Sequence, residues 1–447
     1  MEHKVPQNPL IPIQDQLFIA DGEPHVFNGK MYVYGSRDLI DSVESDGSFD
    51  FCSKSYHVIY SDDLLVWHDG GESIRLSDIP KELREGEPTR LWAPDAFQCP
   101  VCGKYFLTFC TNRQRCYIAE SDSPTGPFSN VKIITLNGNP ITNIDPGVLA
   151  DDDGKVYIVG PNFWIGQLDP EDYSKILPGT FTDVRKYMPM DNEPFEGPSL
   201  RKRDNKYYYI YIQNNGKIKD EVAPVRMAYM TADAPLGPYE YGGIIVNTYE
   251  YPGSANVHGS IEKWKGEWYV FYHMPVADLE LTRTMFADKI MFNQDGSINQ
   301  LLPTSSGVRG PFKKNDEVPS SCAVIFSKGR KGRRVHLDKY KYGEKYEIKD
   351  YPYVFFYEVG EWIGFRYWDL TGIESFTIRF SAEGRVKLIL RSEAELLAEF
   401  NITGTNGEIK TLTQKIKKVS TEKICTLFAE ICEISSDGQL VLYSIKG

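Results

Sequence analysis

The sequence predicts an all-β protein: a five-bladed β-propeller followed by a smaller antiparallel β-sandwich. The first observation is composition, since aromatic residues make up 13% of the 447 residues, with 28 Tyr and 23 Phe, and these residue types favour strands. The second is a hairpin pattern that occurs five times in residues 1–312. The third is a change of pattern beyond that point, which predicts a second domain at 320–447.

Each copy of the hairpin pattern has a tight turn followed by alternating aromatic and β-branched residues. The copies read HVFNGKMYVYGS, VCGKYFLTFC, DDDGKVYIVG, KRDNKYYYIYI and EKWKGEWYVFYH, with turn residues Gly29, Gly103, Gly154, Asn205 and Gly266. The turns lie roughly 50 to 75 residues apart, which suits about four strands per unit, and such repeated units indicate a propeller. Five copies predict five blades.

The second domain begins after a polar stretch that contains Pro303, Pro311 and Pro319. Beyond it, short alternating runs such as SFTIRF, RVKLIL and LVLYSI predict an antiparallel sandwich. We expect this domain to be structural, shaping the pocket or an oligomer interface. The sequence does not predict an oligomeric state.

The charge balance excludes some partners. A formal charge of -12 and a pI near 5.2 would repel phosphate groups, so we expect neither nucleic acid nor a membrane surface as partner. Neutral ligands fit better. The N-terminal stretch has no apolar signal-like run and no 18 apolar residues occur together, which favours a cytoplasmic location.

Eight cysteines fit that expectation as buried reduced thiols, because cytosolic conditions disfavour disulfides. The pair Cys99 and Cys102 in CPVC has a spacing that can hold zinc or carry out redox chemistry. No second C-x-x-C follows, and the pair lies at a hairpin turn. We therefore interpret it as structural.

An ionisable residue stands eight or nine positions before each of the five turn residues: Asp21, Asp95, Asp145, Glu196 and His258. The innermost strands of a propeller line its axis, so equivalent positions converge at one end of the channel. Facing carboxylates are costly unless one is protonated or they serve a task. Asp21, Asp145 and Glu196 are therefore the predicted site, whereas Asp95 could equally bind backbone N–H groups.

The segments around these acids resemble glycoside hydrolase family 43, the five-bladed propeller enzymes that include α-L-arabinofuranosidases, β-xylosidases and arabinanases. The similar segments are FIADGEPHVFNGKMYVYGSRD, LWAPDAF, NIDPGVLADDDGKVYIVG, FEGPSLRKRDNKYYYIYI and HGSIEKWKGEWYVFYH. The resemblance implies that Asp21 is the general base, Glu196 the general acid and Asp145 the carboxylate that tunes the acid. The family often has Asp-Pro at the base, whereas DGEP delays the proline to Pro24. Glu23 is thus a rival base, although the spacing to Gly29 favours Asp21.

Hydrolysis with inversion explains why two kinds of carboxyl group are needed. One acid protonates the leaving oxygen while a carboxylate roughly 6.5 to 9.5 Å away activates water on the opposite face. We expect burial beside Phe195 and repulsion from Asp145 to raise the pKa of Glu196. Asp21 must stay ionised.

Four more residues are candidate substrate-binding groups: Trp92, Trp164, His258 and Arg283. Either tryptophan could stack on a sugar or pack within a blade. The resemblance implies that His258 lies on the axis, often near a calcium or other ion, and that Arg283 reaches the substrate or a catalytic carboxylate. The alternatives are an internal hydrogen-bonding histidine and a surface salt bridge. The chemistry needs no cofactor, and we assign no metal ligands. A calcium ion on the axis is expected from the resemblance alone.

The predicted function is an inverting exo-glycosidase that removes terminal α-L-arabinofuranosyl or β-D-xylosyl units from plant-derived oligosaccharides. One alternative is a non-catalytic glycan-binding propeller, and another is galactosyl or fructosyl specificity, for which the insertion DLIDSVESDGSFDFCSKSY could decide. The C-terminal domain weakly resembles family 6 carbohydrate-binding modules. Its Trp362, Tyr367 and Trp368 could bind sugar, but core packing is the better interpretation.

Overall fold

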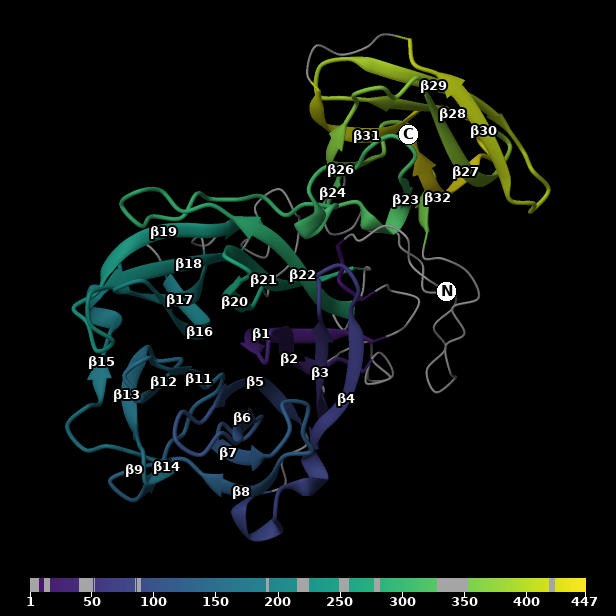
Figure 1. Cartoon of the computed structure of the whole chain (residues 1–447). Helices are drawn as coiled ribbons and strands as arrows, with labels where there is room; N and C mark the ends of the chain where they lie inside the picture. The colour runs from purple at the N-terminus through teal and green to yellow at the C-terminus, as the bar shows by residue number, and fades with distance from the viewer. Residues whose placement is uncertain are drawn as a thin grey trace.

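The computed structural model describes residues 8–11, 17–39, 51, 53–84, 86, 90–189, 193–214, 225–248, 257–276, 282–327, 353–417 and 423–447. Strands dominate these residues, and the helices among them are short 3-10 turns. The chain forms a propeller followed by a sandwich (Figure 1), which confirms the predicted all-β class. None of the helices in the described ranges has the length and apolar character needed to cross a membrane.

Three blades are four-stranded antiparallel meanders. Blade 1 contains β1 (Ile19–Phe27), β2 (Lys30–Arg37), β3 (Ser55–Ser61) and β4 (His68–Arg75). Blade 2 contains β5 (Leu91–Gln98), β6 (Tyr105–Thr111), β7 (Cys116–Ser121) and β8 (Ser129–Ile133). Blade 4 contains β16 (Glu193–Arg203), β17 (Lys206–Asn214), β18 (Val225–Ala232) and β19 (Glu240–Asn247).

Blades 3 and 5 depart from this pattern. Blade 3 consists of β11 (Gly147–Ala150), β12 (Val156–Gly160), β13 (Trp164–Asp169) and β14 (Asp172–Ile176), extended by β9 (Thr135–Leu136), β10 (Asn139–Pro140) and β15 (Thr182–Asp183). Blade 5 consists of β20 (Gly259–Trp264), β21 (Glu267–Pro275) and β22 (Arg283–Ile290). Residues 8–11 lie beside β22, where the Leu10 N–H donates a hydrogen bond to Met285 O at 2.8 Å. The start of the chain thus closes the ring onto its last blade.

The predicted hairpin turns join the first two strands of every blade. Glycine occupies the left-handed region at Gly29 (φ 77°), Gly103 (φ 74°), Gly154 (φ 83°) and Gly266 (φ 91°), as tight turns require. In blade 4 the left-handed residue is Asp204 (φ 55°), directly before the predicted Asn205. The turn residues therefore set the register of the five hairpins.

The innermost strands β1, β5, β11, β16 and β20 surround the centre of the propeller (Figure 1). In β1, β5 and β16 the pairing with the next strand is interrupted near the same end, with register shifts between Ala20 and Glu23, between Trp92 and Asp95, and between Glu196 and Ser199. A bulge bends a strand and re-aims a side chain. The bulges therefore turn side chains at these positions toward the axis.

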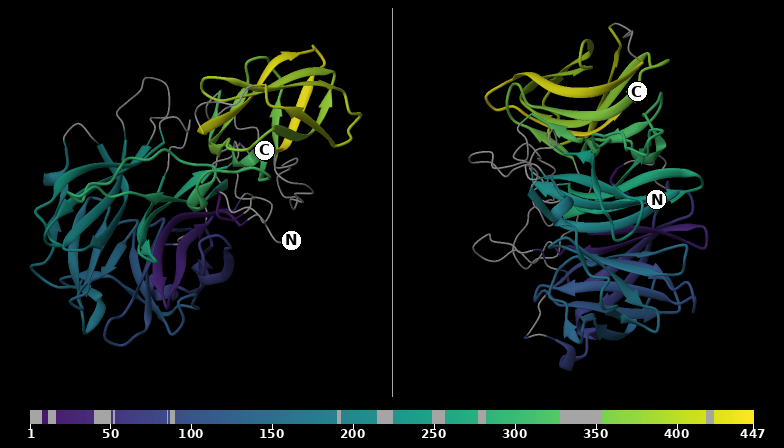
Figure 2. Two further views of the ribbon diagram at one scale, coloured as in Figure 1. Left: turned by 45° about the horizontal axis from the view of Figure 1, so that its top comes forward. Right: turned by 90° about the vertical axis from the view of Figure 1, so that its left-hand side faces the viewer.

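The sandwich packs two antiparallel five-stranded sheets against each other (Figure 2). One sheet contains β23 (Glu317–Pro319), β25 (Val354–Phe356), β27 (Ser375–Glu383), β30 (Lys410–Lys415) and β32 (Gln439–Lys446). The other contains β24 (Ile325–Phe326), β26 (Trp362–Asp369), β28 (Arg385–Arg391), β29 (Leu396–Thr403) and β31 (Ile424–Ile434). The first strand starts at Glu317, inside the linker predicted between 312 and 320.

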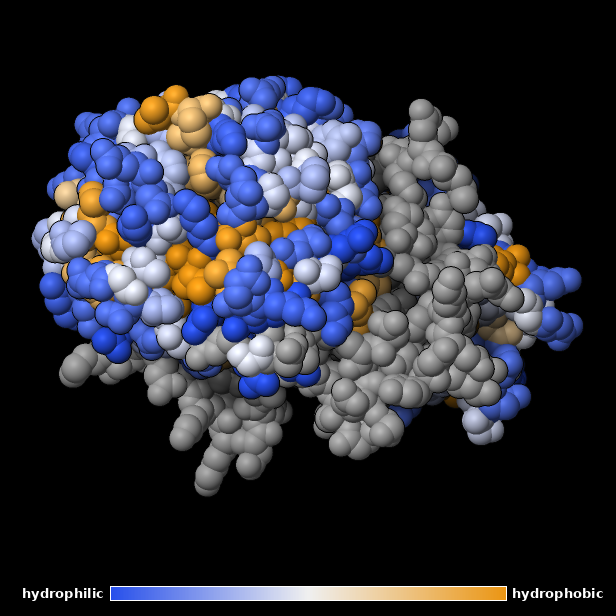
Figure 3. Space-filling model, turned by 90° about the horizontal axis from the view of Figure 1, so that it is seen from below, coloured by the Kyte–Doolittle hydropathy of each residue, from blue (hydrophilic) through white to orange (hydrophobic). Residues whose placement is uncertain are grey.

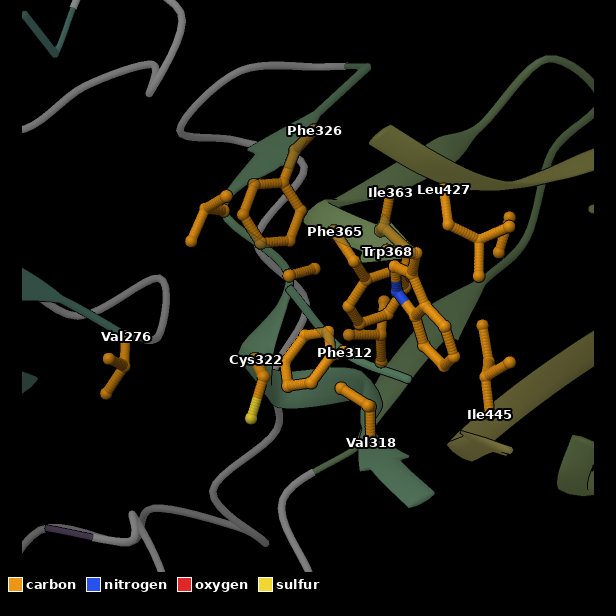
Figure 4. Close-up of a cluster of buried hydrophobic side chains, with 14 of the residues drawn as sticks. Val276, Phe312, Val318, Cys322, Phe326, Ile363, Phe365, Trp368, Leu427 and Ile445 are labelled. Carbon is orange, nitrogen blue, oxygen red and sulfur yellow. The ribbon is translucent and has the colours of Figure 1, made fainter. Parts of the chain in front are cut away.

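A continuous hydrophobic cluster joins the sandwich to the propeller (Figure 4). Phe312 packs on Trp368 with ring centroids 5.3 Å apart, and the Ser305 N–H donates to Arg366 O at 2.5 Å. Trp368 is fully buried and Trp362 packs edge-on against Phe428. Core packing thus describes Trp368, whereas Trp362 is only partly buried, and the two domains share one buried interface.

The outer surface carries much of the charge. Viewed from below, it is mostly hydrophilic, with hydrophobic residues gathered in a band across it (Figure 3). This distribution agrees with a chain in which 25% of residues are charged. The hydrophobic residues of the hairpins are instead buried within and between the blades.

Candidate active site

Asp21 lies at the bulge of β1, with its backbone in the left-handed region (φ 56°). Its Oδ1 accepts a hydrogen bond from Arg283 Nη1 at 3.0 Å. Its backbone N–H donates to His273 Nδ1 at 2.8 Å. A non-glycine residue in this conformation costs about 1 to 3 kcal/mol, so these two buried contacts hold the carboxylate in a costly position at the channel end.

Asp145 and Glu196 come together from neighbouring blades. Asp145 lies two residues before β11, and its backbone is also in the left-handed region (φ 47°). Its Oδ2 accepts a hydrogen bond from the Gly197 N–H at 3.3 Å. Because Gly197 follows Glu196, this bond fixes the acid-bearing turn of β16 beside Asp145.

The environments of the three acids separate their pKa values. Burial would raise the pKa of Asp21, but the charge of Arg283, reinforced by His258, outweighs it and lowers the pKa to about 2. Burial raises the pKa of Asp145 to about 6, with His258 opposing and Asp21 reinforcing the rise. Burial and the nearby charge of Asp145 raise the pKa of Glu196 to about 8. Near neutral pH, Asp21 is therefore ionised while Glu196 keeps its proton.

Phe195 does not produce this burial. Its residue is 45% exposed, because neighbouring residues of a strand point to different sides. Glu196 is desolvated by the channel itself. The pKa of Glu196 is raised, as expected. The expectation that Phe195 causes the burial is wrong, because much of that side chain is exposed.

His258 lies directly before β20, between two of the acids. Its Nδ1 is 3.9 Å from Asp21 Oδ1, and its Nε2 is 3.5 Å from Glu23 Oε1. Burial would lower its pKa, but Glu23, Asp145 and Asp21 raise it to about 9. The ring is an imidazolium near neutral pH and adds a positive charge beneath the site.

Gly197 makes the close approach of this histidine feasible. A Cβ at Gly197 would lie 3.1 Å from the His258 ring and 3.0 Å from Ile212, and its φ of 61° is in the region that favours glycine. The glycine after Glu196 therefore allows the acid-bearing turn to pack against the imidazolium.

Arg283 is buried and binds two carboxylates from blade 1. Its Nε and Nη2 donate to Asp38 at 2.9 and 2.8 Å, while Nη1 donates to Asp21. The guanidinium also lies 3.9 Å from the centroid of the Phe51 ring. A surface salt bridge is thus excluded for Arg283, and the group is held on three sides.

Asp38 and Phe51 were not among the predicted site residues. Both lie at the edges of the insertion at 38–56, whose residues 40–50 and 52 are outside the described ranges. Asp38 is buried where β2 ends. An acid at the site end of a propeller strand was the signal that could have identified it.

Glu23 and Asp95 lie deeper along the axis than the three acids. Glu23 Oε2 accepts hydrogen bonds from Arg201 Nη2 at 2.6 Å and Ser199 Oγ at 3.0 Å. Asp95 binds the Val148 N–H at 2.7 Å and His25 Nε2 at 2.5 Å. The register shifts make Asp95 the counterpart of Glu23 rather than of Asp21, so its backbone-binding interpretation describes its contacts.

The two predicted tryptophans differ in position. The Trp92 indole N–H donates to Phe51 O at 3.1 Å, which links it to the ring under Arg283. Trp164 is 5% exposed and stacks on Phe181 with centroids 5.1 Å apart, so its described contacts lie within blade 3. Sugar stacking by either residue stays a prediction.

The residues around His258 do not fit a calcium ion. Calcium takes six to eight oxygen ligands, whereas Glu23 here lies between the Arg201 guanidinium and the His258 imidazolium. No cluster of three or more His, Cys, Asp or Glu side chains suited to a metal occurs within the described part of the chain. The Cys99 and Cys102 turn also lacks further ligands of these types, and the Cys102 N–H donates to Cys99 Sγ at 3.0 Å.

Comparison with known proteins places this geometry in a family. A xylosidase/arabinosidase from Thermoclostridium stercorarium is 27% identical over 83% of this chain and 85% of its own. One from Bacteroides ovatus is 28% identical over 63% of this chain and 94% of its own. Both relatives therefore align along most of their length.

Solved structures agree. A β-xylosidase/α-arabinofuranosidase of family 43 from a compost microbial metagenome, in complex with xylotriose, is 27% identical with a TM-score of 0.54, covering 67% of this chain and 98% of its own. A Bacillus subtilis arabinoxylan arabinofuranohydrolase, in complex with cellotetraose, covers 98% of this chain and 96% of its own with a TM-score of 0.56. At 21% identity, the second shows the fold alone. The model of glycosyl hydrolases family 43 matches residues 30–298, and this chain is therefore a member of that family and a glycoside hydrolase.

Proposed function

We propose that the protein is an inverting exo-glycosidase in which Glu196 is the general acid, Asp21 the general base and Asp145 the modulator of the acid. The geometry that carries this proposal is the meeting of the three acids at one channel end, where Arg283 binds Asp21 and the Gly197 N–H fixes Glu196 beside Asp145. It orders the pKa values as about 2 for Asp21, about 6 for Asp145 and about 8 for Glu196. Two carboxyl groups held in opposite protonation states are what general acid and base catalysis needs.

In the proposed reaction, Glu196 donates its proton to the glycosidic oxygen as the bond to the anomeric carbon breaks. Asp21 accepts a proton from a water molecule whose oxygen attacks that carbon from the opposite face. The product sugar then has the inverted anomeric configuration. Glu196 ends ionised and Asp21 protonated, and exchange with solvent restores both.

The remaining charges support these roles. Arg283 keeps Asp21 ionised, so its carboxylate is ready to accept a proton. Asp145 raises the pKa of Glu196 and accepts the Gly197 N–H, which orients the acid. Glu23 is a poor base because Arg201 neutralises it and it is 1% exposed.

For the substrate, we propose terminal α-L-arabinofuranosyl or β-D-xylosyl units of short xylan-derived oligosaccharides, hydrolysed in the cytoplasm. The relatives named above are xylosidase/arabinosidase enzymes, and related structures were solved with xylose and xylotriose. The C-terminal domain is proposed to be structural, since Trp368 is fully buried in it and Trp362 packs against Phe428.

A panel of 4-nitrophenyl glycosides tests the function. We expect release of 4-nitrophenol from the α-L-arabinofuranoside or the β-D-xyloside, and a loss of about 10³-fold or more in Glu196→Gln, whose amide cannot donate the proton. Glu240→Gln, at an exposed residue of β19 in the same blade, is the matched control. Binding of xylo-oligosaccharides without turnover by the native protein would instead support a glycan-binding propeller.

A further inference from the structure

A buried arginine lies on the propeller axis beneath the acids. The Arg201 side chain, from β16, is 4% exposed. Its Nη2 is 2.6 Å from Glu23 Oε2, its Nη1 is 3.8 Å from Asp95 Oδ2 and its Nε is 3.9 Å from Glu262 Oε2. One guanidinium from blade 4 therefore faces carboxylates from blades 1, 2 and 5.

The charges at this level need such a cation. A buried carboxylate without a partner is strongly destabilising. Burial raises the pKa of Glu262, while Arg201 opposes that rise. His25 adds a second nitrogen group, with Nε2 2.5 Å from Asp95 Oδ1 and 3.5 Å from Arg201 Nη2. The planar guanidinium suits this place because it offers donors in several directions within one plane.

A chain of contacts links Arg201 to the catalytic level. Arg201 binds one oxygen of Glu23, and the other oxygen of Glu23 is 3.5 Å from His258 Nε2. The opposite ring nitrogen of His258 is 3.9 Å from Asp21 Oδ1. A change in the position or charge of Glu23 is thus transmitted to the imidazolium that faces the acids.

We propose that Arg201 is the axial cation of this propeller, a positioning residue that fixes Glu23 and, through it, His258 beneath the acids. A divalent ion in the same place would have to displace a guanidinium that lies 2.6 Å from Glu23 and would be repelled by the His258 imidazolium, whose Nε2 is 3.5 Å from the same carboxylate. Catalysis by this protein therefore requires no axial metal ion. The proposal rests on the proposed glycosidase function.

The first test combines substitution with chemical rescue. Arg201→Ala leaves a space lined by Glu23, Asp95 and Glu262, so we expect kcat on the reactive aryl glycoside to fall by about ten- to a hundred-fold, with KM changed less. Millimolar guanidinium should restore part of that loss, and Arg201→Lys should retain more activity than Arg201→Ala. Lys202→Ala, which removes a charge paired with Asp151, should keep wild-type kcat and show no rescue.

The second test uses the native protein, so it does not depend on folding of a variant. Dialysis against EDTA, followed by addition of calcium, should leave kcat unchanged. Loss of activity on chelation with recovery on calcium addition would overturn the proposal. So would wild-type kcat in Arg201→Ala.

A thermal readout separates this inference from the proposed function. Guanidinium that binds the folded Arg201→Ala site should raise its Tm at millimolar concentrations, where wild type and Lys202→Ala show no rise. If native protein releases no sugar but this rise occurs, the function is wrong and the axial role of Arg201 stands. If native protein is active but the variant shows neither rescue nor a rise in Tm, the axial role is wrong.

Discussion

Arg283 Nη1 lies 3.0 Å from Asp21 Oδ1, while the same guanidinium binds Asp38 through Nε and Nη2. Blade 5 thus holds the carboxylate of blade 1 in its ionised form. The contact lowers the pKa of Asp21 against the effect of burial. Protonation of the base therefore does not limit activity near neutral pH. The acid, Glu196, sets that limit.

The pH profile should show this directly. Glu196 must be protonated to act, and its pKa is raised to about 8. We therefore expect kcat/KM to stay constant up to near pH 8 and to fall about ten-fold per pH unit above it. Protonation of Asp21, with a pKa of about 2, should not reduce activity above pH 4. Initial rates between pH 4 and 10 test the basic limb and the absence of an acidic limb above pH 4, and a basic limb centred below pH 6 would contradict the assignment.

Asp145→Asn should move the basic limb to lower pH. The negative charge of Asp145 is the second cause of the raised pKa of Glu196, so its removal lowers that pKa by about one or more units. We expect kcat at pH 7.5 to fall about three-fold for a shift of one unit and about 25-fold for a shift of two, with recovery as the pH is lowered. Asp151→Asn, on the same blade beyond β11, is the control that should leave the limb in place.

Arg283→Met should damage both catalysis and stability. It leaves Asp21 and Asp38 without their buried cation, and breaking a buried ion pair costs about 3 to 5 kcal/mol. The pKa of Asp21 should rise, which moves the acidic limb of kcat/KM to higher pH. Urea unfolding and the pH profile measure the two effects, with Lys289→Met on the exposed face of β22 as control. An unchanged acidic limb would show that Arg283 does not control the base.

Phe312→Ala should destabilise the junction of propeller and sandwich. The ring is fully buried against Trp368, and truncation of a buried Phe costs about 3 to 5 kcal/mol. Unfolding followed by urea should show a lowered midpoint, whereas Val359→Ala, at a residue that is 61% exposed, should not. Loss of the sandwich transition alone, with the propeller unchanged, would argue against a shared core.

The blades and the three acids could be predicted because their signals are local. A turn glycine and alternating aromatic residues specify each hairpin, and the acids stand at a constant distance before the turns. Asp95 shows the limit of such counting. It stands at the same spacing as Asp21, but the turn from Gln98 to Tyr105 is longer than the turn from Phe27 to Lys30, so Asp95 lies at the level of Glu23.

Contacts between blades could not be predicted in this way. Asp38 with Arg283 and Glu23 with Arg201 join residues far apart in the chain, and no spacing rule connects them. Trp164 and Phe195 show the same difficulty for exposure, because the sequence does not state which side of a strand faces the axis. The resemblance placed Arg283 correctly at a carboxylate, whereas nothing in the run RKR distinguishes Arg201 from its neighbours.

The most direct test is the anomeric configuration of the first product, followed by proton NMR during hydrolysis of the reactive aryl glycoside by native protein. With Glu196 donating to one face and Asp21 activating water at the other, the β-xyloside should release α-xylose, or the α-arabinofuranoside β-arabinofuranose, before mutarotation. Release of the retained anomer would contradict direct displacement by water and with it the assigned roles of both residues.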